Sequence, residues 1–570
     1  MDGPPRYGGT LRLYGPGSMD HLDPACAYYA LGGQIIRLFA RQLFSYRAVR
    51  DLRDQAAITP VPDVAAEVPT RDNGGLSADL ATYTIRLRPG VGWDSSPVRA
   101  VTAADFVRGF KRMCNPVTRA GAISYFTSTI LGMADYCDAY AEAVPDPIAS
   151  PAELAGFQNS HEIAGIRALD ELTLQFRLIR PANDFLNILA LTFASAAPVE
   201  YDAFVPDSAE FRAGVRSNGP YRITWYRHGQ EIRLARNPAW RPESDDIRHQ
   251  YLDGLQVRME KATPEQVGEQ IATGRADLSW ASPITEPYEV NPTDPGNDLG
   301  YALNPYLVFN FQSPNADGAI GKLKVRQAIA YAIDKIAIAE IYDKLEAGTV
   351  MRPAHNAIPP CNDGHREFDL YPTPGDRGDP RRSRQLLAEA GYRDELTLIA
   401  AHRDVDANPE VAHSYAADLA QCGITVRFVA FGHADYYPFL QDPANARAGR
   451  WDISAPSWTP DWYGNNGRAY LQPMFQTNFA RGTSNYGGYS NPVVDRLIEQ
   501  ALSVGDPAQA TELWHQVDLN VMRDAAIVPI LAHAPTIPHL RGARVRNAIA
   551  MPTVDRWFDL SNLWLVSDAQ

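Results

Sequence analysis

The sequence predicts an α/β protein with two lobes, and three observations along the chain lead to this prediction. The first half is rich in short segments with alternating apolar side chains, as at residues 81–90 and 171–181. A strand–helix–strand succession at residues 395–431 is typical of parallel pairing in an α/β layer. Strand-like sequence returns at residues 525–532, which indicates that the chain comes back to its first lobe. Two lobes joined by more than one crossing can close over a ligand.

The individual elements follow from apolar spacing and from the residues at their ends. Residues 219–240 predict a hairpin with its turn at 228–229, because alternating segments flank that pair. Residues 324–342 predict one helix, since apolar side chains recur there at helical spacing. Residues 379–391 predict another, with Asp379 as N-cap, a proline in the first turn and a glycine at the end.

Length and charge restrict the class of protein. A chain of 570 residues is long enough for about two to four domains. Its 53 basic and 67 acidic residues give a net charge of −14, which argues against a nucleic-acid binder that relies on a basic face. The richest apolar run, at residues 188–197, is shorter than the roughly 18 residues of a membrane span and reads as a buried element.

The first residues lack the basic start and the apolar core of a signal peptide. Two interpretations remain open. Either the protein is cytoplasmic and Met1 is its native start, or the chain is the mature form of an exported protein to which a methionine was added.

Five cysteines are spread along the chain without a C-x-x-C pair, so the common zinc and thioredoxin-like patterns are absent. Cys114 and Cys137 stand at the two ends of one local segment. A disulfide there would contribute roughly 3 kcal/mol by the chain-entropy estimate. It would also indicate an oxidising compartment. Two ordinary buried thiols are the alternative.

Several stretches occur in an order that is typical of one family. They are GGTLRLY, YTIRLRPGVGW, TAADFVRGFKRMCNP, SNGPYRITWYRHGQEIRLARNPAW, KVRQAIAYAIDK, YGGYSNPVVDRLIEQAL and AAIVPIL. Through them the chain resembles the extracellular solute-binding proteins of family 5, the peptide and nickel type, which serve ABC importers. The composition around WTPDWYGNNGRAY resembles the branch of high-GC Gram-positive bacteria.

The resemblance implies a fold and a division of the chain. The fold would be the two-lobed periplasmic-binding-protein-like α/β fold of class II, cluster C, with an extra strand-rich subdomain. Lobe I would comprise residues 1–303 and 526–570, lobe II residues 304–525, and the subdomain would lie at about 48–180.

The resemblance also bears on the compartment and the partners. It favours the bridge between Cys114 and Cys137, and it leaves a pair between Cys361 and Cys422 open. It implies an extracellular lipoprotein after removal of a signal, a monomer that presents its ligand to a membrane permease. We expect no cofactor, no metal and no nucleic acid.

A lone carboxylate among aromatic residues predicts the ammonium site of a peptide ligand. Burying an ammonium is costly unless an acid pairs with it, and an aromatic wall adds cation–π attraction. Asp461 matches the aspartate that peptide-binding relatives use for this ammonium, and Trp458, Trp462 and Tyr463 would form the walls. The alternative is an aspartate that caps a turn, with the tryptophans in ordinary core.

Arg403 is the candidate for the carboxylate of a short ligand. It follows a lobe-II strand, where relatives that bind dipeptides place an arginine. A guanidinium suits this task because its planar fork makes two parallel hydrogen bonds. Asp404 and Asp406 stand nearby and would repel a carboxylate, and a solvated surface arginine is the alternative.

Four further residues are expected to face the ligand. Asn310 lies on a strand near the expected hinge, and Tyr486 and Tyr489 lie in a glycine-rich stretch that could pair with an extended peptide. Tyr28 follows the first strand. Core packing or a surface turn is the alternative for each.

Three other classes of function compete with peptide binding. A recruited enzyme acting on a peptide-like metabolite would use Asp461, His402 and His433 as acid or base, although no catalytic motif is present. A metal-chelate carrier finds little support, because His355 and His365 match no ligand motif. An oligosaccharide binder would stack sugars on the tryptophans. The sequence favours a non-enzymatic binding protein for oligopeptides or a peptide-like small molecule.

Overall fold

The computed structural model describes most of the chain and divides it into two compact units. Described are residues 3–51, 54–118, 120–145, 149–281, 300–345, 350–393, 396–480, 482–504, 506–534, 540–554 and 557–566. Unit 1 comprises Met1–Ile284 and His539–Gln570, and unit 2 comprises Thr285–Pro538. Among the described helices, none has both the length and the apolar composition that crossing a bilayer requires.

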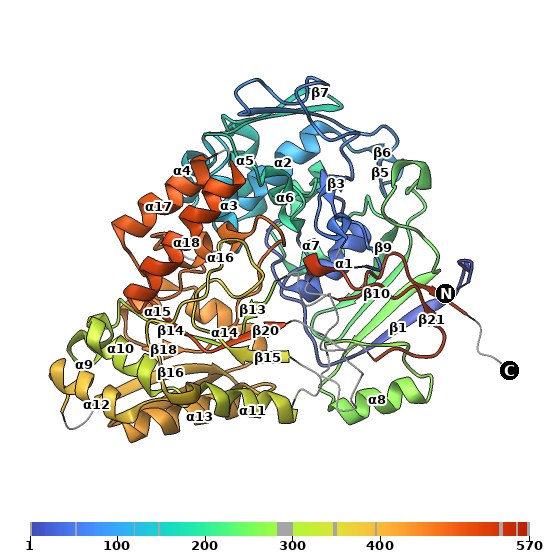
Figure 1. Ribbon diagram of the computed structural model, residues 1–570. Coiled ribbons are helices and arrows are strands. Elements are labelled where there is room, and N and C mark those ends of the chain that lie inside the picture. Colours follow the sequence, from blue (N-terminus) through green and yellow to red (C-terminus); the bar gives the residue numbers. More distant parts are fainter. Residues whose placement is uncertain are drawn as a thin grey trace. The chain divides into compact units, whose positions relative to one another are not determined.

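Unit 1 contains a five-stranded sheet with the order β12-β1-β11-β10-β9 (Figure 1). Its strands are β1 (Thr10–Gly15), β9 (Tyr221–Arg227), β10 (Glu231–Arg236), β11 (Gly254–Met259) and β12 (Leu278–Ser279). β1 runs parallel to β11 and β12. β9 and β10 form the predicted hairpin, whose turn contains Gly229 at a φ of 64°, a conformation that glycine adopts without strain. The helix α1 (Ala30–Phe39) packs against β9.

A smaller sheet with the order β4-β8-β7 lies within the range predicted for the extra subdomain. Its strands are β4 (Thr82–Arg86), β7 (Ile166–Asp170) and β8 (Thr173–Arg177), so the predicted strands at 81–90 and 171–181 are confirmed. The accompanying helices are α2 (Ala103–Met113), α3 (Ile123–Thr127), α4 (Met133–Ala143) and α5 (Pro151–Ser160). α2 packs against β7 and β8 and begins with a capping box between Thr102 and Asp105.

A disulfide bond joins α2 to α4. Cys114 is the C-cap of α2 and Cys137 lies inside α4, and a disulfide links them across a Cα–Cα distance of 4.7 Å. No bond joins Cys361 to Cys422; the first is exposed and the second is buried.

Unit 2 is built on a five-stranded sheet with the order β17-β16-β18-β14-β19. Its strands are β14 (Tyr306–Phe309), β16 (Leu396–Arg403), β17 (Ile424–Phe431), β18 (Ile453–Ser454) and β19 (Ile527–Pro529). β16 and β17 are parallel, and α13 (Asn408–Gln421) connects them and packs against both. The predicted strand–helix–strand unit is therefore confirmed, and its apolar side chains form one core with the helices around it.

The helical segment predicted at 324–342 forms two helices instead of one, α10 (Leu323–Ala332) and α11 (Lys335–Leu345). The break occurs because the carboxylate of Asp334 accepts a hydrogen bond of 2.8 Å from the backbone N–H of Ala337, as an N-cap does. The predicted start of α12 (Pro380–Glu389) is confirmed, since Asp379 accepts hydrogen bonds from two N–H groups of its first turn. α12 packs against α10.

Three further helices of unit 2 pack on one another. They are α16 (Gly467–Phe475), α17 (Pro492–Ser503) and α18 (Pro507–Arg523). A small sheet with the order β13-β20-β15 completes the unit. Its strands are β13 (Ala302–Leu303), β15 (Val350–Pro353) and β20 (Leu531–Ala534).

The division of the chain by contacts lies at Ile284 and Pro538, whereas the sequence analysis placed the lobe boundaries at 303 and 526. Strand pairing explains the difference. β19 pairs with β14, and β20 pairs with β13 and β15, so residues 526–534 share sheets with unit 2. The lobe boundaries themselves stay a prediction.

Candidate functional site

A candidate ligand site of unit 2 lies at the carboxyl ends of β16 and β17. The two strands are parallel, so their ends meet at one edge of the sheet, where Arg403 pairs in register with Phe431. The chain then enters α14 (His433–Leu440), which carries Tyr436 and Tyr437. We define the arginine–tyrosine cluster as Arg403, Tyr436, Tyr437 and Tyr486.

Two rings of this cluster lie against the guanidinium. Cζ of Arg403 lies 5.5 Å from the ring centre of Tyr436 and 5.6 Å from that of Tyr437. The two tyrosine rings meet edge to face at 5.0 Å, and the ring of Tyr486 lies 6.0 Å from that of Tyr437. Each ring face attracts the cation by about 0.5–2 kcal/mol, so the tyrosines hold the guanidinium without neutralising it.

Hydrogen bonds fix the position of Tyr436 in the arginine–tyrosine cluster. The hydroxyl of Tyr436 lies 2.6 Å from the hydroxyl of Ser454, which donates to the carbonyl of Ala401 at 2.7 Å. Tyr436 is buried, and this burial raises the pKa of its phenol. Its ring therefore stays neutral at physiological pH and gives Arg403 a rigid support at the end of β16.

Arg403 is half-buried, and its guanidinium differs from those of the fully buried arginines of unit 1 in what it contacts. Its Nε is buried and has no hydrogen-bond partner among the described residues. In unit 1, by contrast, Arg41 and Arg248 both bind the carboxylate of Asp63, at 2.8 and 2.6 Å. An arginine keeps its charge in proteins, and a buried charge is costly unless it is paired. Within the described part of the chain, Arg403 forms no ion pair with a carboxylate, and Asp406 acts on its charge only electrostatically.

The aromatic side chains expected to wall the ammonium site are buried. Trp458 and Trp462 are 4% and 0% exposed, and Tyr463 is also fully buried. The indole N–H of Trp458 donates to the carbonyl of Ala469 at 2.9 Å, and that of Trp462 donates to the carbonyl of Asn465 at 3.2 Å. These bonds shape the loop itself, whether or not the ring faces also contact a ligand.

Asp461 lies in the same loop and is half-buried, between buried Pro460 and buried Trp462. The loop starts next to the arginine–tyrosine cluster, because the hydroxyl of Ser457 lies 3.4 Å from that of Tyr437. The two residues predicted to bind the ends of a peptide, Asp461 and Arg403, are thus carried by neighbouring segments of one unit.

Asn310 and Tyr489 are engaged within unit 2. The amide of Asn310 donates to the carbonyls of Ala446 and Trp451 at 2.9 and 2.8 Å, and its oxygen accepts from the N–H of Gln312 at 3.0 Å. The hydroxyl of Tyr489 donates to the carboxylate of Asp524 at 2.6 Å. Both residues have clear structural tasks, and their predicted contact with a ligand stays a prediction.

Tyr28 belongs to unit 1. Its backbone N–H donates to the carboxylate of Asp20 at 2.6 Å, and its ring lies 5.8 Å from that of Phe193. It is half-buried, just before α1. Its role in ligand binding stays a prediction.

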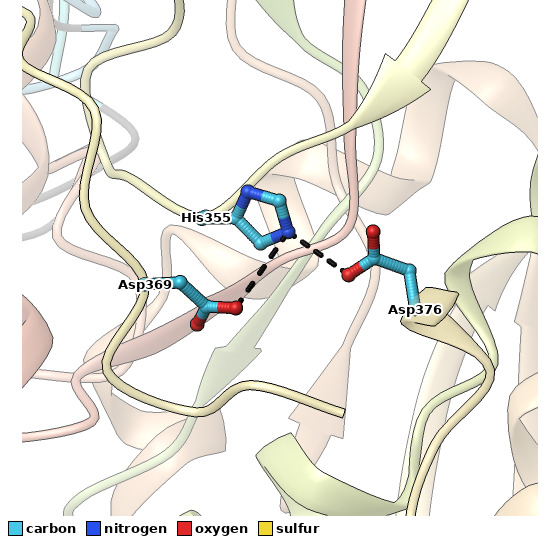
Figure 2. A group of neighbouring side chains, drawn as sticks. All are labelled: His355, Asp369 and Asp376. Atoms are coloured by element: carbon cyan, nitrogen blue, oxygen red, sulfur yellow. Dashed lines mark hydrogen bonds and ion pairs between the residues drawn. The ribbon is translucent and has the colours of Figure 1, made fainter. Parts of the chain in front are cut away.

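The histidines named for other functions lie in different surroundings. Nδ1 of His402 lies 2.9 Å from the carbonyl of Arg403, and its ring contacts Phe428. The side chain of His433 lies outside the described part. His355 lies beside Asp369 and Asp376, and the donor atoms of these three are all within 4.8 Å of one another (Figure 2).

Sequence reasoning missed Tyr436 and Tyr437. A signal for them was present, since they follow the strand that runs parallel to the one ending at Arg403. Side chains that follow neighbouring parallel strands gather at the same edge of the sheet. The aromatic pair could therefore have been assigned to the surroundings of Arg403.

Comparisons with known proteins agree on one family. The profile described as bacterial extracellular solute-binding proteins, family 5 Middle, matches residues 59–481. The dipeptide-binding protein of Escherichia coli K12 is 27% identical over 492 residues, which cover 82% of this chain and 80% of that protein. Its name is that of a binding protein rather than an enzyme.

Two solved structures illustrate the likeness of the fold. The clavulanic acid biosynthesis oligopeptide binding protein 2 superposes with a TM-score of 0.76 at 24% identity, covering 99% of this chain and 96% of that one. DppA from Helicobacter pylori, solved in complex with the peptide STSA, superposes with a TM-score of 0.69 at 19% identity, covering 99% of both chains.

The predicted fold class is confirmed by these structures, which match the chain over nearly its whole length. The family profile spans well over half of the 570 residues. The chain therefore belongs to the bacterial extracellular solute-binding proteins of family 5.

Proposed function

We propose that this chain is the substrate-binding component of an ABC importer and that its ligand is an oligopeptide or a peptide-like small molecule. Family membership, the dipeptide-binding relative and the peptide in the Helicobacter pylori structure support the proposal. The protein passes its ligand to a permease in the membrane and performs no chemistry on it.

The environment of Arg403 is the main structural support for the proposal. A charged guanidinium that lies beside two tyrosine rings and forms no ion pair with a carboxylate among the described residues suits the carboxylate of a ligand. Its planar fork can make two parallel hydrogen bonds to both oxygens. Arg403 lies at the end of β16, and only a ligand short enough for its carboxyl end to reach this position would pair with it.

Asp461 supplies the opposite charge for the ligand's ammonium. Its loop contacts the arginine–tyrosine cluster through Ser457 and Tyr437, so the two charges belong to one region of unit 2. A carboxylate beside buried aromatic side chains attracts an ammonium more strongly than one in water, because the surroundings screen it less.

The state of the tryptophans favours a peptide over an oligosaccharide. Sugars stack on exposed faces of aromatic rings, whereas Trp458 and Trp462 are 4% and 0% exposed. Their indole N–H groups also donate to backbone carbonyls, which leaves them unable to donate to sugar hydroxyls.

The decisive test removes the carboxylate of Asp461 from the protein and, separately, the ammonium from the ligand. Asp461→Ala should weaken binding of alanyl-alanine by about 1.5–3 kcal/mol, the scale of a hydrogen bond to a charged group, in isothermal titration calorimetry. N-acetylated alanyl-alanine has no ammonium, so it should bind the parent and the variant equally poorly.

Asp404→Ala is the matched control. It removes an exposed acid beside Arg403, and it should leave the affinity unchanged or raise it. If Asp461→Ala binds the dipeptide as tightly as the parent does, the ammonium assignment is wrong.

Native mass spectrometry of the purified protein would show whether peptides accompany it.

We further propose that the protein acts as a monomer outside the cytoplasm, anchored as a lipoprotein. The family's extracellular members and the disulfide between Cys114 and Cys137 support an oxidising compartment. Intact mass measured with and without reductant should differ by two hydrogen atoms for protein isolated from the cell surface. Equal masses would contradict the bridge.

A further inference from the structure

A second cluster of ligating side chains lies in unit 2, on segments that the arginine–tyrosine cluster does not use. His355 follows β15 (Val350–Pro353) by two residues, Asp369 lies in the irregular segment beyond it, and Asp376 ends a short 3-10 turn. Figure 2 shows the three side chains converging from these separate segments. Nε2 of His355 lies 2.9 Å from Oδ1 of Asp376 and 3.9 Å from Oδ2 of Asp369.

We propose that His355, Asp369 and Asp376 bind one divalent transition-metal ion of the zinc type. Two carboxylates converge on the same imidazole nitrogen, and a single N–H can serve only one of them well. A metal ion accepts a lone pair from all three groups at once. Zinc binds nitrogen and oxygen donors at about 2.0–2.2 Å, so tetrahedral ligands lie about 3.3–3.6 Å apart. The separations of 2.9 and 3.9 Å bracket that value.

An outer carboxylate lies near the other ring nitrogen of His355. Oε1 of Glu367 is 3.5 Å from Nδ1, within ion-pair range and on the side of the ring away from the two aspartates. When the proton is on Nδ1, it lies on the side of this carboxylate, and the lone pair of Nε2 is left for the ion. Metal-bound histidines in proteins usually carry such a partner on their other nitrogen.

The charges around the cluster leave its two aspartates available to a cation. Arg377 follows Asp376 directly, but it forms its ion pairs with Asp334 and Glu340, at 3.6 and 3.0 Å. Lys335 is the rival cation, since Asp369 and Asp376 both act on it electrostatically. Its ammonium donates to the carbonyl of Ala354 at 2.6 Å, and among the described residues it forms no ion pair with either aspartate.

Access and donor type point to the class of ion. The side chains of His355, Asp369 and Asp376 are 18%, 29% and 27% exposed, so an ion can enter from solvent and keep a water as its fourth ligand. An imidazole among the donors favours zinc, nickel, cobalt or copper over calcium and magnesium, which prefer oxygen alone. The ion would tie the segment after β15 to the turn before α12.

The test uses the full chain, without a histidine tag, after treatment with a chelator. The parent should bind one equivalent of Zn²⁺ in competition with a chromophoric chelator, and bound Co²⁺ should give a visible absorption band. Asp376→Asn and His355→Gln should each weaken Zn²⁺ binding by at least about tenfold, because each removes one of only three protein ligands.

His365→Gln is the matched control, because this neighbouring histidine contacts Glu367 at 3.5 Å but lies outside the triad. It should retain the parent affinity within about threefold, and Glu367→Gln should fall between the control and the triad variants. Circular dichroism verifies that each variant is folded. The proposal is overturned if the parent binds no Zn²⁺, or if Asp376→Asn and His355→Gln bind it as the parent does.

Discussion

Two regions of unit 2 were both expected to meet the ligand, and they differ in how their polar atoms are used. Around Asn310, the side-chain amide makes two hydrogen bonds to carbonyls and its oxygen accepts a third. In the arginine–tyrosine cluster, Arg403 contacts ring faces, and its Nε has no partner among the described residues. Asn310 is a neutral amide that is fully buried, whereas Arg403 is charged and only half-buried. We use the presence or absence of an internal partner to predict which polar group is structural and which is left for a ligand.

The largest effect that tests this distinction is expected in the loop with Trp458 and Trp462. Trp462→Ala should lower the free energy of unfolding by about 3–5 kcal/mol, because it empties a fully buried site in unit 2. Chemical denaturation measures the change. If Trp462 acted mainly as a wall of the ligand site, the loss would appear in peptide affinity, and the free energy of unfolding would hardly change.

Trp225→Ala is a matched control for that variant. Trp225 lies on β9 of unit 1 and is 49% exposed, so its removal should leave the free energy of unfolding within about 1 kcal/mol of the parent. An equal loss in both variants would show that the effect comes from removing any indole rather than from the burial of Trp462.

Arg403→Met should show the reverse pattern. We expect the affinity for alanyl-alanine to fall by about 2–3 kcal/mol, because two charge-assisted hydrogen bonds to the carboxylate are lost. The free energy of unfolding should change by less than about 1 kcal/mol, because the lost attraction to the rings of Tyr436 and Tyr437 is offset by removing a charge that folding takes partly out of water. Calorimetry and denaturation on the same preparation measure both quantities.

Arg248→Met supplies the contrast. Arg248 binds the buried carboxylate of Asp63 at 2.6 Å, so its loss should destabilise unit 1 and leave peptide affinity unaltered in the folded protein.

A dipeptide amide, which lacks the carboxylate, should bind the Arg403→Met variant and the parent alike. If Arg403→Met binds free dipeptide like the parent, Arg403 is a structural arginine after all.

Much of the fold could be predicted because it depends on local patterns. The alternation in β4 and β8, the hairpin of β9 and β10, and the N-cap of α12 are all visible within a few neighbouring residues. The break between α10 and α11 was missed, because apolar spacing continues across it while the carboxylate of Asp334 starts a new helix.

The site was harder to predict because its contacts join distant segments. Arg403 could be named because it matches an arginine of relatives that bind dipeptides, whereas the tyrosines beside it come from α14, beyond the next strand. The same holds for His355, whose partner Asp376 lies 21 residues further along the chain. The path of the intervening loop decides whether two such residues meet in space. Their spacing in the sequence does not reveal it.

Asp518 sharpens the comparison, because it is a buried acid with hydrogen bonds but no ion pair among the described residues. Its two oxygens accept from the N–H groups of Ala357 and Ile358, at 2.8 and 3.4 Å. Burial raises the pKa of Asp518 to about 7, although these hydrogen bonds act in the opposite direction. The unfolded chain has the ordinary aspartate pKa of about 3.9.

The folded protein therefore holds a proton that the unfolded chain releases. The resulting contribution to the free energy of unfolding is fully present below about pH 4 and is lost as the pH rises through 7. Between about pH 5.5 and 8 the loss attributable to Asp518 should be on the order of 2 kcal/mol. Asp518→Asn does not titrate, so denaturation across this range should show a flatter dependence on pH than in the parent. An unchanged slope would mean that two backbone N–H groups suffice to keep a buried carboxylate ionised, and the absence of an internal counter-charge at Arg403 would then be weaker evidence for a ligand.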